Sequence, residues 1–179
     1  MLRALNTRYH ATALAVFAVI VVGHWAEHIA QAFQIYVLGW PTKQANGVLG
    51  LAWPWLVTSE WMHYGYAVIM MIAFLALRPG FTGRSRTWWN AATGIQIWHH
   101  FEHLLLLLQA LTGSFLLGAA QPTSVAQLVF PRVELHLFYN TIVTIPMIVA
   151  MVLHRHPRPD DEPAGCTCSA VRHRESVPA

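Results

Sequence analysis

His24-Trp25-Ala26-Glu27-His28 is the stretch of the sequence that decides the fold. The same pattern, His-x-x-Glu-His, returns as His99-His100-Phe101-Glu102-His103. Each copy lies within a run of apolar residues long enough to cross a membrane. Ionisable side chains are costly in hydrocarbon, and those that occur there usually have a function. The sequence therefore predicts a membrane-embedded metal site, built by a duplicated pair of helices.

The composition indicates an integral membrane protein of one domain. Apolar residues make up 55% of the 179 residues and charged residues only 11%, whereas about a quarter of the residues of a soluble protein are charged. The formal net charge is +3 and the arginines are scattered along the chain. We therefore expect the lipid bilayer as a partner and no nucleic acid.

Four apolar segments predict an all-α bundle of four transmembrane helices. A lead-in of residues 1–10 precedes a transmembrane domain of residues 11–155, and the polar residues 156–179 are expected to form a disordered tail. The four helices are placed at residues 11–39, 50–77, 88–117 and 131–153.

The basic residues predict the orientation of the bundle. Nine arginines lie before the first helix, between the second and third, or after the fourth, whereas the opposite side has only Lys43 and Arg132. Because basic residues accumulate on the cytoplasmic side, both termini are expected in the cytoplasm.

The two halves of the domain, residues 11–78 and 88–155, carry the same landmarks in the same order. After its pentad, each half has Pro-Thr, then Leu-x-x-Pro, then a glutamate and a histidine, and then a tyrosine three residues beyond that histidine. The last three landmarks are Glu60, His63 and Tyr66 in the first half and Glu134, His136 and Tyr139 in the second. A duplicated two-helix unit returns the chain to its starting side, so we expect parallel repeats related by an axis along the membrane normal.

Helical spacing gathers the ionisable residues of each half. Residues three and four apart share one face of a helix, so His24, Glu27 and His28 project together. We expect no lysine or arginine beside the glutamates, so bound cations would balance their charge. The predicted metal ligands are His24, Glu27, His28, Glu60, His63, His99, Glu102, His103, Glu134 and His136. Because ten ligands are too many for one ion, we predict two metal ions.

The ligand types narrow the choice of metal. Imidazole and carboxylate together suit iron first, with copper, zinc and manganese as alternatives, and argue against calcium and magnesium. His100 points about 100° away from His99 on a helix, so we expect it to contact the ligands rather than a metal. Tyr66 and Tyr139 are expected to be catalytic, as relays of protons or electrons.

Two families of di-iron proteins resemble this ligand pattern. Glu60-x-x-His63 is similar to the Glu-x-x-His motif of carboxylate-bridged di-iron bundles. Glu134-x-His136 departs from that motif, because its side chains lie about 200° apart on a helix. The outer histidines of the two pentads resemble the His-x-x-x-His boxes of membrane fatty-acid hydroxylases and desaturases. The resemblance covers the ligands alone and implies an oxidoreductase that acts on oxygen or a lipid-soluble substrate.

Three other functions stay open. Haem or another tetrapyrrole would use histidines as axial ligands, and the spacing of His10 and His24 hints at this. Handling of copper or zinc would use Cys166 and Cys168, whose close spacing argues against a disulfide between them. The sequence does not decide whether they bind metal. The chain is also small enough to be an accessory subunit of a larger membrane complex, or one chain of a homo-oligomer.

Overall fold

The computed structural model describes residues 1–158, 161, 165–166 and 168. All regular structure in this part of the chain is helical, which confirms the all-α prediction there. The helices are α1 (Leu2–Leu5), α2 (His10–Tyr36), α3 (Leu49–Ala52), α4 (Trp55–Thr58), α5 (Glu60–Leu77), η1 (Arg78–Gly80), α6 (Gly83–Thr112), η2 (Leu116–Gly118), η3 (Ala126–Leu128) and α7 (Arg132–Arg155).

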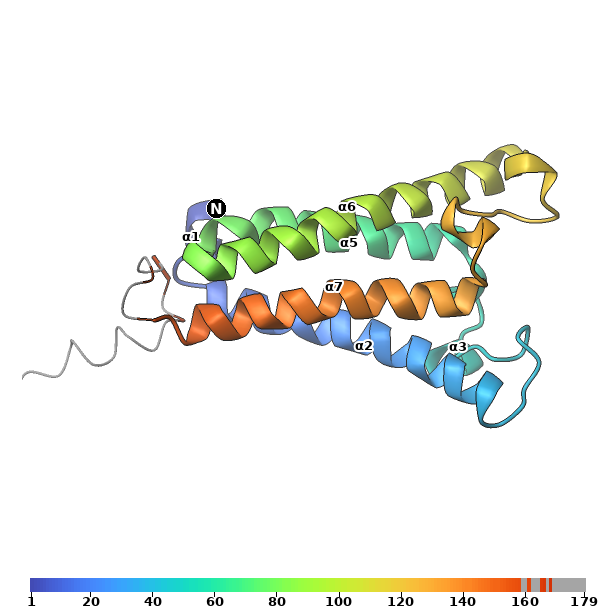
Figure 1. Cartoon of the computed structure of the whole chain (residues 1–179), viewed down its shortest axis with the longest axis horizontal. Helices are drawn as coiled ribbons and strands as arrows, with labels where there is room; N and C mark the ends of the chain where they lie inside the picture. Colours follow the sequence, from blue (N-terminus) through green and yellow to red (C-terminus); the bar gives the residue numbers. More distant parts are fainter. Residues whose placement is uncertain (159–160, 162–164, 167, 169–179) are drawn as a thin grey trace, which may run out of the picture.

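The four long helices α2, α5, α6 and α7 form a bundle in which consecutive long helices run in opposite directions (Figure 1). α6 packs along both α5 and α7, and α2 packs along α7 and α5. The N-terminus, η1 and the end of α7 share one end of the bundle, which we call the tail end. The connections that contain α3, α4, η2 and η3 lie at the other end, which we call the loop end.

Three of the long helices are long and apolar enough to cross a membrane. They are α2, α5 together with η1, and α7. α6 does not meet this criterion of length and composition, so the predicted count of four spanning helices is corrected to three. The reason is that α6 carries polar side chains on its buried face, among them Thr93, Gln96 and Glu102, and these lower its mean hydropathy.

Two of the predicted helices have different bounds in the structure. Residues 50–77 do not form one helix: α3 ends before Pro54, and extended backbone at Ser59 (φ −88°, ψ 117°) separates α4 from α5. Proline has no N–H for a helical hydrogen bond, which explains the first break. α6 begins at Gly83, five residues before the predicted start at 88, and ends where Gly113 adopts the left-handed conformation (φ 68°).

The apolar core fills the tail-end half of the bundle. Large side chains from all four long helices meet there, with Phe17, Phe74, Trp89 and Met147 between 0% and 3% exposed. The Trp89 indole N–H donates to the carbonyl oxygen of Phe74 at 2.9 Å, so the largest core side chain is also hydrogen-bonded. This packing leaves the loop-end half for the polar residues of the bundle.

The predicted disorder of residues 156–179 falls mostly outside the described residues. Among the described ones, Asp161 accepts hydrogen bonds from Arg84 at 2.9 and 3.1 Å. The Arg84 guanidinium lowers the pKa of the Asp161 carboxyl to about 2. This ion pair lies near the surface, with the Arg84 side chain 37% exposed, so we expect it to stabilise the fold only slightly.

Candidate metal centre

Six histidines from the four long helices gather in the loop-end half of the bundle. Five of them are buried, and His24 is partly buried. We call this group the histidine centre; it consists of His24 and His28 from α2, His63 from α5, His99 and His103 from α6, and His136 from α7.

His136 is the hub of the histidine centre. Its ring centroid lies 5.2 Å from that of His103 and 5.3 Å from that of His28. The rings of His63 and His99 each lie 5.9 Å from it. One histidine on α7 therefore contacts histidines on all three other long helices.

Each pentad contributes one close pair of ring nitrogens. The Nε2 atoms of His24 and His28 are 3.1 Å apart, and so are those of His99 and His103. Within each pair the rings meet edge to face, with centroids 4.6 and 4.5 Å apart. The two pairs therefore have almost the same geometry.

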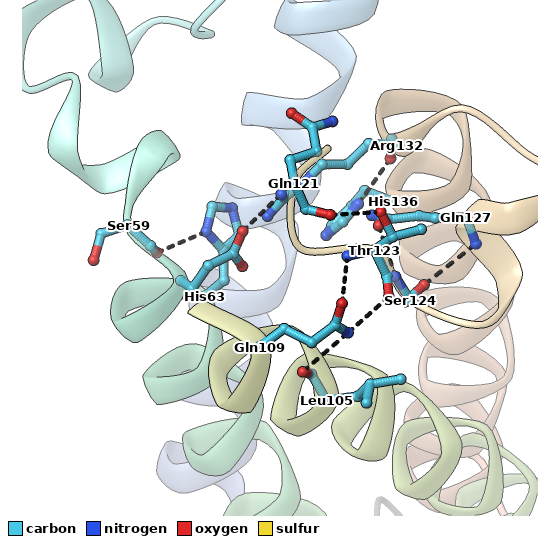
Figure 2. Close-up of polar contacts among 11 residues, drawn as sticks. Ser59, His63, Leu105, Gln109, Gln121, Thr123, Ser124, Gln127, Arg132 and His136 are labelled. Carbon is cyan, nitrogen blue, oxygen red and sulfur yellow. Dashed lines mark hydrogen bonds and ion pairs between the residues drawn. The ribbon is translucent and has the colours of Figure 1, made fainter. Parts of the chain in front are cut away.

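Two rings have their tautomer set by the first turn of their own helix. His63 Nδ1 donates to the carbonyl oxygen of Ser59 at 3.0 Å, and His136 Nδ1 donates to that of Arg132 at 2.8 Å (Figure 2). Because a carbonyl oxygen only accepts, Nδ1 carries the proton, and the neutral ring has an unprotonated Nε2. His136 Nε2 is buried and has no hydrogen-bond partner among the described residues. Metal-binding histidines commonly have this arrangement.

Gln31 sets the tautomer of a third ring. Its side-chain Oε1 accepts from His28 Nδ1 at 2.8 Å, and its Nε2 donates to the carbonyl oxygen of Ala45 at 3.3 Å. The second bond orients the amide, so that oxygen faces His28. The sequence predicted metal ligands on this helix but not the role of Gln31 as a partner of His28. That role could have been inferred, because Gln31 follows His28 by three residues and so lies on the same face of the helix.

Glu27 holds the loop that follows its own helix. Its Oε2 accepts from the backbone N–H groups of Val48 at 2.7 Å and Leu49 at 3.0 Å. Gly47 allows this approach, because it has φ 72° and a Cβ there would collide with the Glu27 carboxylate. The structure thus places a predicted metal ligand against loop backbone.

Glu102 makes the matching contact in the second half. Its Oε1 accepts from the backbone N–H of Ala126 at 2.9 Å, in the connection between α6 and α7. In both halves, the carboxylate of the pentad therefore binds the backbone of the loop that follows.

The other two glutamates pair with side chains at the loop end. Glu60 forms an ion pair with Arg132 at 2.7 Å, so the expectation that no arginine lies beside the glutamates was wrong. Arg132 starts α7, and because α5 and α7 both run from the loop end to the tail end, it lies beside the first residue of α5. Glu134 is exposed and accepts a hydrogen bond from the Tyr36 hydroxyl. The four carboxylates thus have partners other than the histidine nitrogens.

The two predicted relay tyrosines lie against the histidine pairs. Tyr66 stacks on His24, with ring centroids 3.7 Å apart and planes 21° apart. Tyr139 covers His99 at 4.6 Å and 34°, and its hydroxyl accepts from the Trp98 indole N–H at 2.8 Å. Both tyrosine rings are therefore in contact with a histidine ring of the centre.

His100 faces away from the hub. Its ring lies 5.3 Å from that of Tyr64, and its Nδ1 is buried without a hydrogen-bond partner among the described residues. It is next in sequence to His99 but on a different face of α6.

An apolar cavity of about 360 Å³ opens beside the first histidine pair. His24, His28, His63 and Tyr66 form part of its wall, and the rest is largely apolar side chains of α2, α5 and the connection between them. The corresponding space beside His99 and His103 is only about 10 Å³. One half of the histidine centre can therefore admit a small apolar molecule, and the other is filled.

A second group of metal-type ligands lies at the tail end. His10, His154, Cys166 and Cys168 offer ligand atoms that all lie within 4.8 Å of one another, so this group could hold a metal ion. We call it the His/Cys cluster. Its two cysteines form a disulfide with Cα atoms 5.5 Å apart, so the expectation that their spacing disfavours a disulfide was wrong. The cluster was foreseeable from the even number of long helices, which brings the start of α2 and the end of α7 to the same end of the bundle.

Comparisons with protein-family models, with curated proteins and with solved structures find no match to this chain. The chemistry available to the site therefore follows from its own residues. What they offer is a set of buried imidazoles beside an apolar cavity.

Proposed function

We propose that this protein is a membrane metalloprotein, in which the histidine centre binds two redox-active metal ions and acts on a lipid-soluble substrate. One observation carries the proposal: three rings from three helices, His28, His63 and His136, have Nδ1 hydrogen-bonded to an oxygen. Each therefore presents an unprotonated Nε2 inside the bundle. The Nε2 lone pair of His136 is buried without a donor among the described residues, which is unfavourable, and a cation bound there would satisfy it.

The donor set favours copper or iron. Imidazole suits iron, copper, nickel and zinc, whereas manganese prefers carboxylate and water oxygens. Since the four glutamates have other partners, manganese becomes less suitable than the composition of the pentads suggested. The two close nitrogen pairs, one on α2 and one on α6, support two ions.

The apolar cavity supports a lipid-soluble substrate. Its walls are mostly apolar, and it reaches His24 and His28 from the side of α2 and α5. Ligand pockets are commonly apolar with a few polar groups that direct the chemistry. Tyr66, which lines the cavity and stacks on His24, is placed to pass a proton or an electron between substrate and centre.

The expected position of the bundle in a membrane agrees with the same function. The apolar helices would place the bundle in the bilayer, and the positions of the arginines would put the tail end and both termini in the cytoplasm. The histidine centre and the cavity would then lie in the outer half. The matching contacts of Glu27 and Glu102 support an origin by duplication of a two-helix unit.

Elemental analysis of protein purified in detergent tests the proposal. We expect about two equivalents of iron or copper per chain and a visible spectrum that changes on reduction. His136→Ala should lower the metal affinity by more than the roughly 10–100-fold that loss of an outer partner costs. His156→Ala, at the exposed end of α7, is the matched control. The proposal would be contradicted if the purified protein contained zinc as its only metal. A Soret band together with an unchanged metal content in His136→Ala would also contradict it.

A second candidate function, metal handling, is favoured by the His/Cys cluster at the opposite end of the bundle. Transport would require a path between the two groups of ligands. The apolar core occupies that region, with Val21, Phe74 and Trp89 all 0% exposed. Flux of copper or zinc into vesicles that contain the protein would favour handling over oxidoreductase chemistry.

A further inference from the structure

The His/Cys cluster joins three distant parts of the chain at the tail end. His10 begins α2, His154 lies in the last turn of α7, and the two cysteines follow in the C-terminal segment. His10 and Cys166 are fully buried, and His154 is 3% exposed. This group lies apart from the histidine centre, beyond the apolar core.

The surroundings of the two imidazoles show that they are closely held. The rings of His10 and His154 meet at 5.0 Å, and the Phe81 ring packs against both, at 5.3 and 4.8 Å. A Cβ at Gly80 would collide with the His10 ring, so only glycine allows this packing. The two rings therefore keep their positions relative to the sulfur atoms.

Hydrogen bonding directs the unprotonated nitrogen of His10 toward sulfur. His10 Nε2 donates to the carbonyl oxygen of Leu77 at 3.2 Å, which leaves Nδ1 unprotonated in the neutral ring, 3.4 Å from Cys168 Sγ. His154 Nε2 lies 3.1 Å from Cys166 Sγ and 2.9 Å from Cys168 Sγ. A backbone carbonyl that orients a ligand histidine is typical of metal sites.

We propose that, in its dithiol form, the cluster binds one Zn²⁺ ion through His10 Nδ1, His154 Nε2 and the thiolates of Cys166 and Cys168. Two sulfur and two nitrogen ligands, three of them from buried side chains and Cys168 partly buried, suit the closed tetrahedral coordination of structural zinc. The ion would hold the C-terminal segment against the first turn of α2 and the last turn of α7.

The disulfide and the zinc site are alternative states of the same cysteines. Two molecules of a thiol reductant convert the disulfide into two cysteine thiols and become one disulfide themselves, so two electrons and two protons pass to the protein. Each cysteine thiol then releases its proton when it binds Zn²⁺. The site would thus fill only under reducing conditions, such as those of the cytoplasm.

Cobalt substitution tests the proposal on the full-length protein in detergent. After reduction with a phosphine and addition of Co²⁺, we expect thiolate-to-cobalt charge-transfer absorption and the visible bands of tetrahedral cobalt. One equivalent of Zn²⁺ should remove both. The histidine centre contains no sulfur, so it cannot produce the charge-transfer signal. Failure of the histidine centre to bind metal would be detected separately, by elemental analysis.

Variants assign the ligands. Cys168→Ser should abolish the charge-transfer absorption, and His10→Ala and His154→Ala should each weaken zinc binding at least tenfold, as competition with a chromophoric chelator would measure. His156→Ala, two residues after His154 and exposed, should bind like the wild type. Absence of the absorption in folded, reduced wild type, or unchanged affinity in both histidine variants, would overturn the proposal.

Discussion

The two halves of the histidine centre place the same residue types in different surroundings. In each, a pair of histidines four residues apart has its Nε2 atoms 3.1 Å apart, and a tyrosine ring covers the first histidine. Beside the first pair lies a cavity of about 360 Å³, whereas beside the second only about 10 Å³ is free. Matching histidine pairs thus lie beside one open side and one closed side of the bundle.

Two sequence differences accompany this asymmetry. The residue before the first pentad is Gly23, whereas Trp98 precedes the second and donates to the Tyr139 hydroxyl. Three residues after the pentads, Gln31 binds His28 while Leu106 occupies the corresponding position. The His28 ring, which donates a hydrogen bond to Gln31 and lies beside an open cavity, suits an ion that reacts with a substrate. A ring pair enclosed by side chains suits an ion that remains bound.

Substitutions at Gly23 and Trp98, the residues before the two pentads, should have the largest effect on the difference between the two sides. A Cβ on Gly23 would meet no described atom within 4 Å, so Gly23→Trp should fill the cavity without disturbing the helix. We expect about 100-fold weaker binding of a medium-chain alcohol, since each lost methylene contact costs 1–3 kcal/mol. Calorimetry on protein in nanodiscs would measure it.

Trp98→Gly is the matched variant. It should open space near Tyr139 and leave alcohol binding at the first half unchanged, at a cost of about 1 kcal/mol in helix stability. Equal loss of alcohol binding in both variants would show that the cavity beside His24 is not where the probe binds.

Removal of the partner of His28 should have an intermediate effect. Gln31→Leu makes the first half resemble the second, and the free His28 ring should lower metal affinity about tenfold, at the lower end of the range for outer partners. Metal competition titrations would measure the change.

Gln34→Leu is the control for this variant. Gln34 exchanges hydrogen bonds with the backbone of Gly47 at 2.9 and 3.0 Å and so holds the same loop without contacting a histidine. If Gln34→Leu lowers the metal affinity as much as Gln31→Leu, the loop rather than the tautomer of His28 is responsible.

Replacement of the pentad glutamates should have the smallest effect. Glu27 accepts two backbone hydrogen bonds and Glu102 accepts one from the loop that follows it. Because hydrogen bonds to a charged group are stronger than those to a neutral amide, Glu27→Gln should lower the free energy of unfolding by about 1–2 kcal/mol and Glu102→Gln by less.

Denaturant unfolding in detergent would compare these two variants, and metal content would be measured alongside. We expect both to retain their metal. A loss of one metal equivalent in either variant, with stability unchanged, would mean that the carboxylate is a ligand after all.

Much of the architecture was predictable because it depends on local periodicity. The apolar runs and the spacing of His24, His28, His99 and His103 require only that each segment be helical, and i, i+4 histidines then meet on one face. The prediction for residues 50–77 failed at two points: Pro54 was a visible signal for the first break, whereas the extended backbone at Ser59 has no such signal in the sequence. α6 does not meet the criterion of composition for a spanning helix, because Thr93, Gln96 and Glu102 lower its mean hydropathy.

The sequence by itself determined the helices, the recurring pentads and the histidines that each helix contributes. The tertiary structure alone decided that His136 is the hub, that the glutamates bind loop backbone or Arg132, and that His10 meets the C-terminal cysteines. The physical reason is that helical periodicity sets the face on which a side chain lies. Its partner depends on how the loops return and how the helices pack.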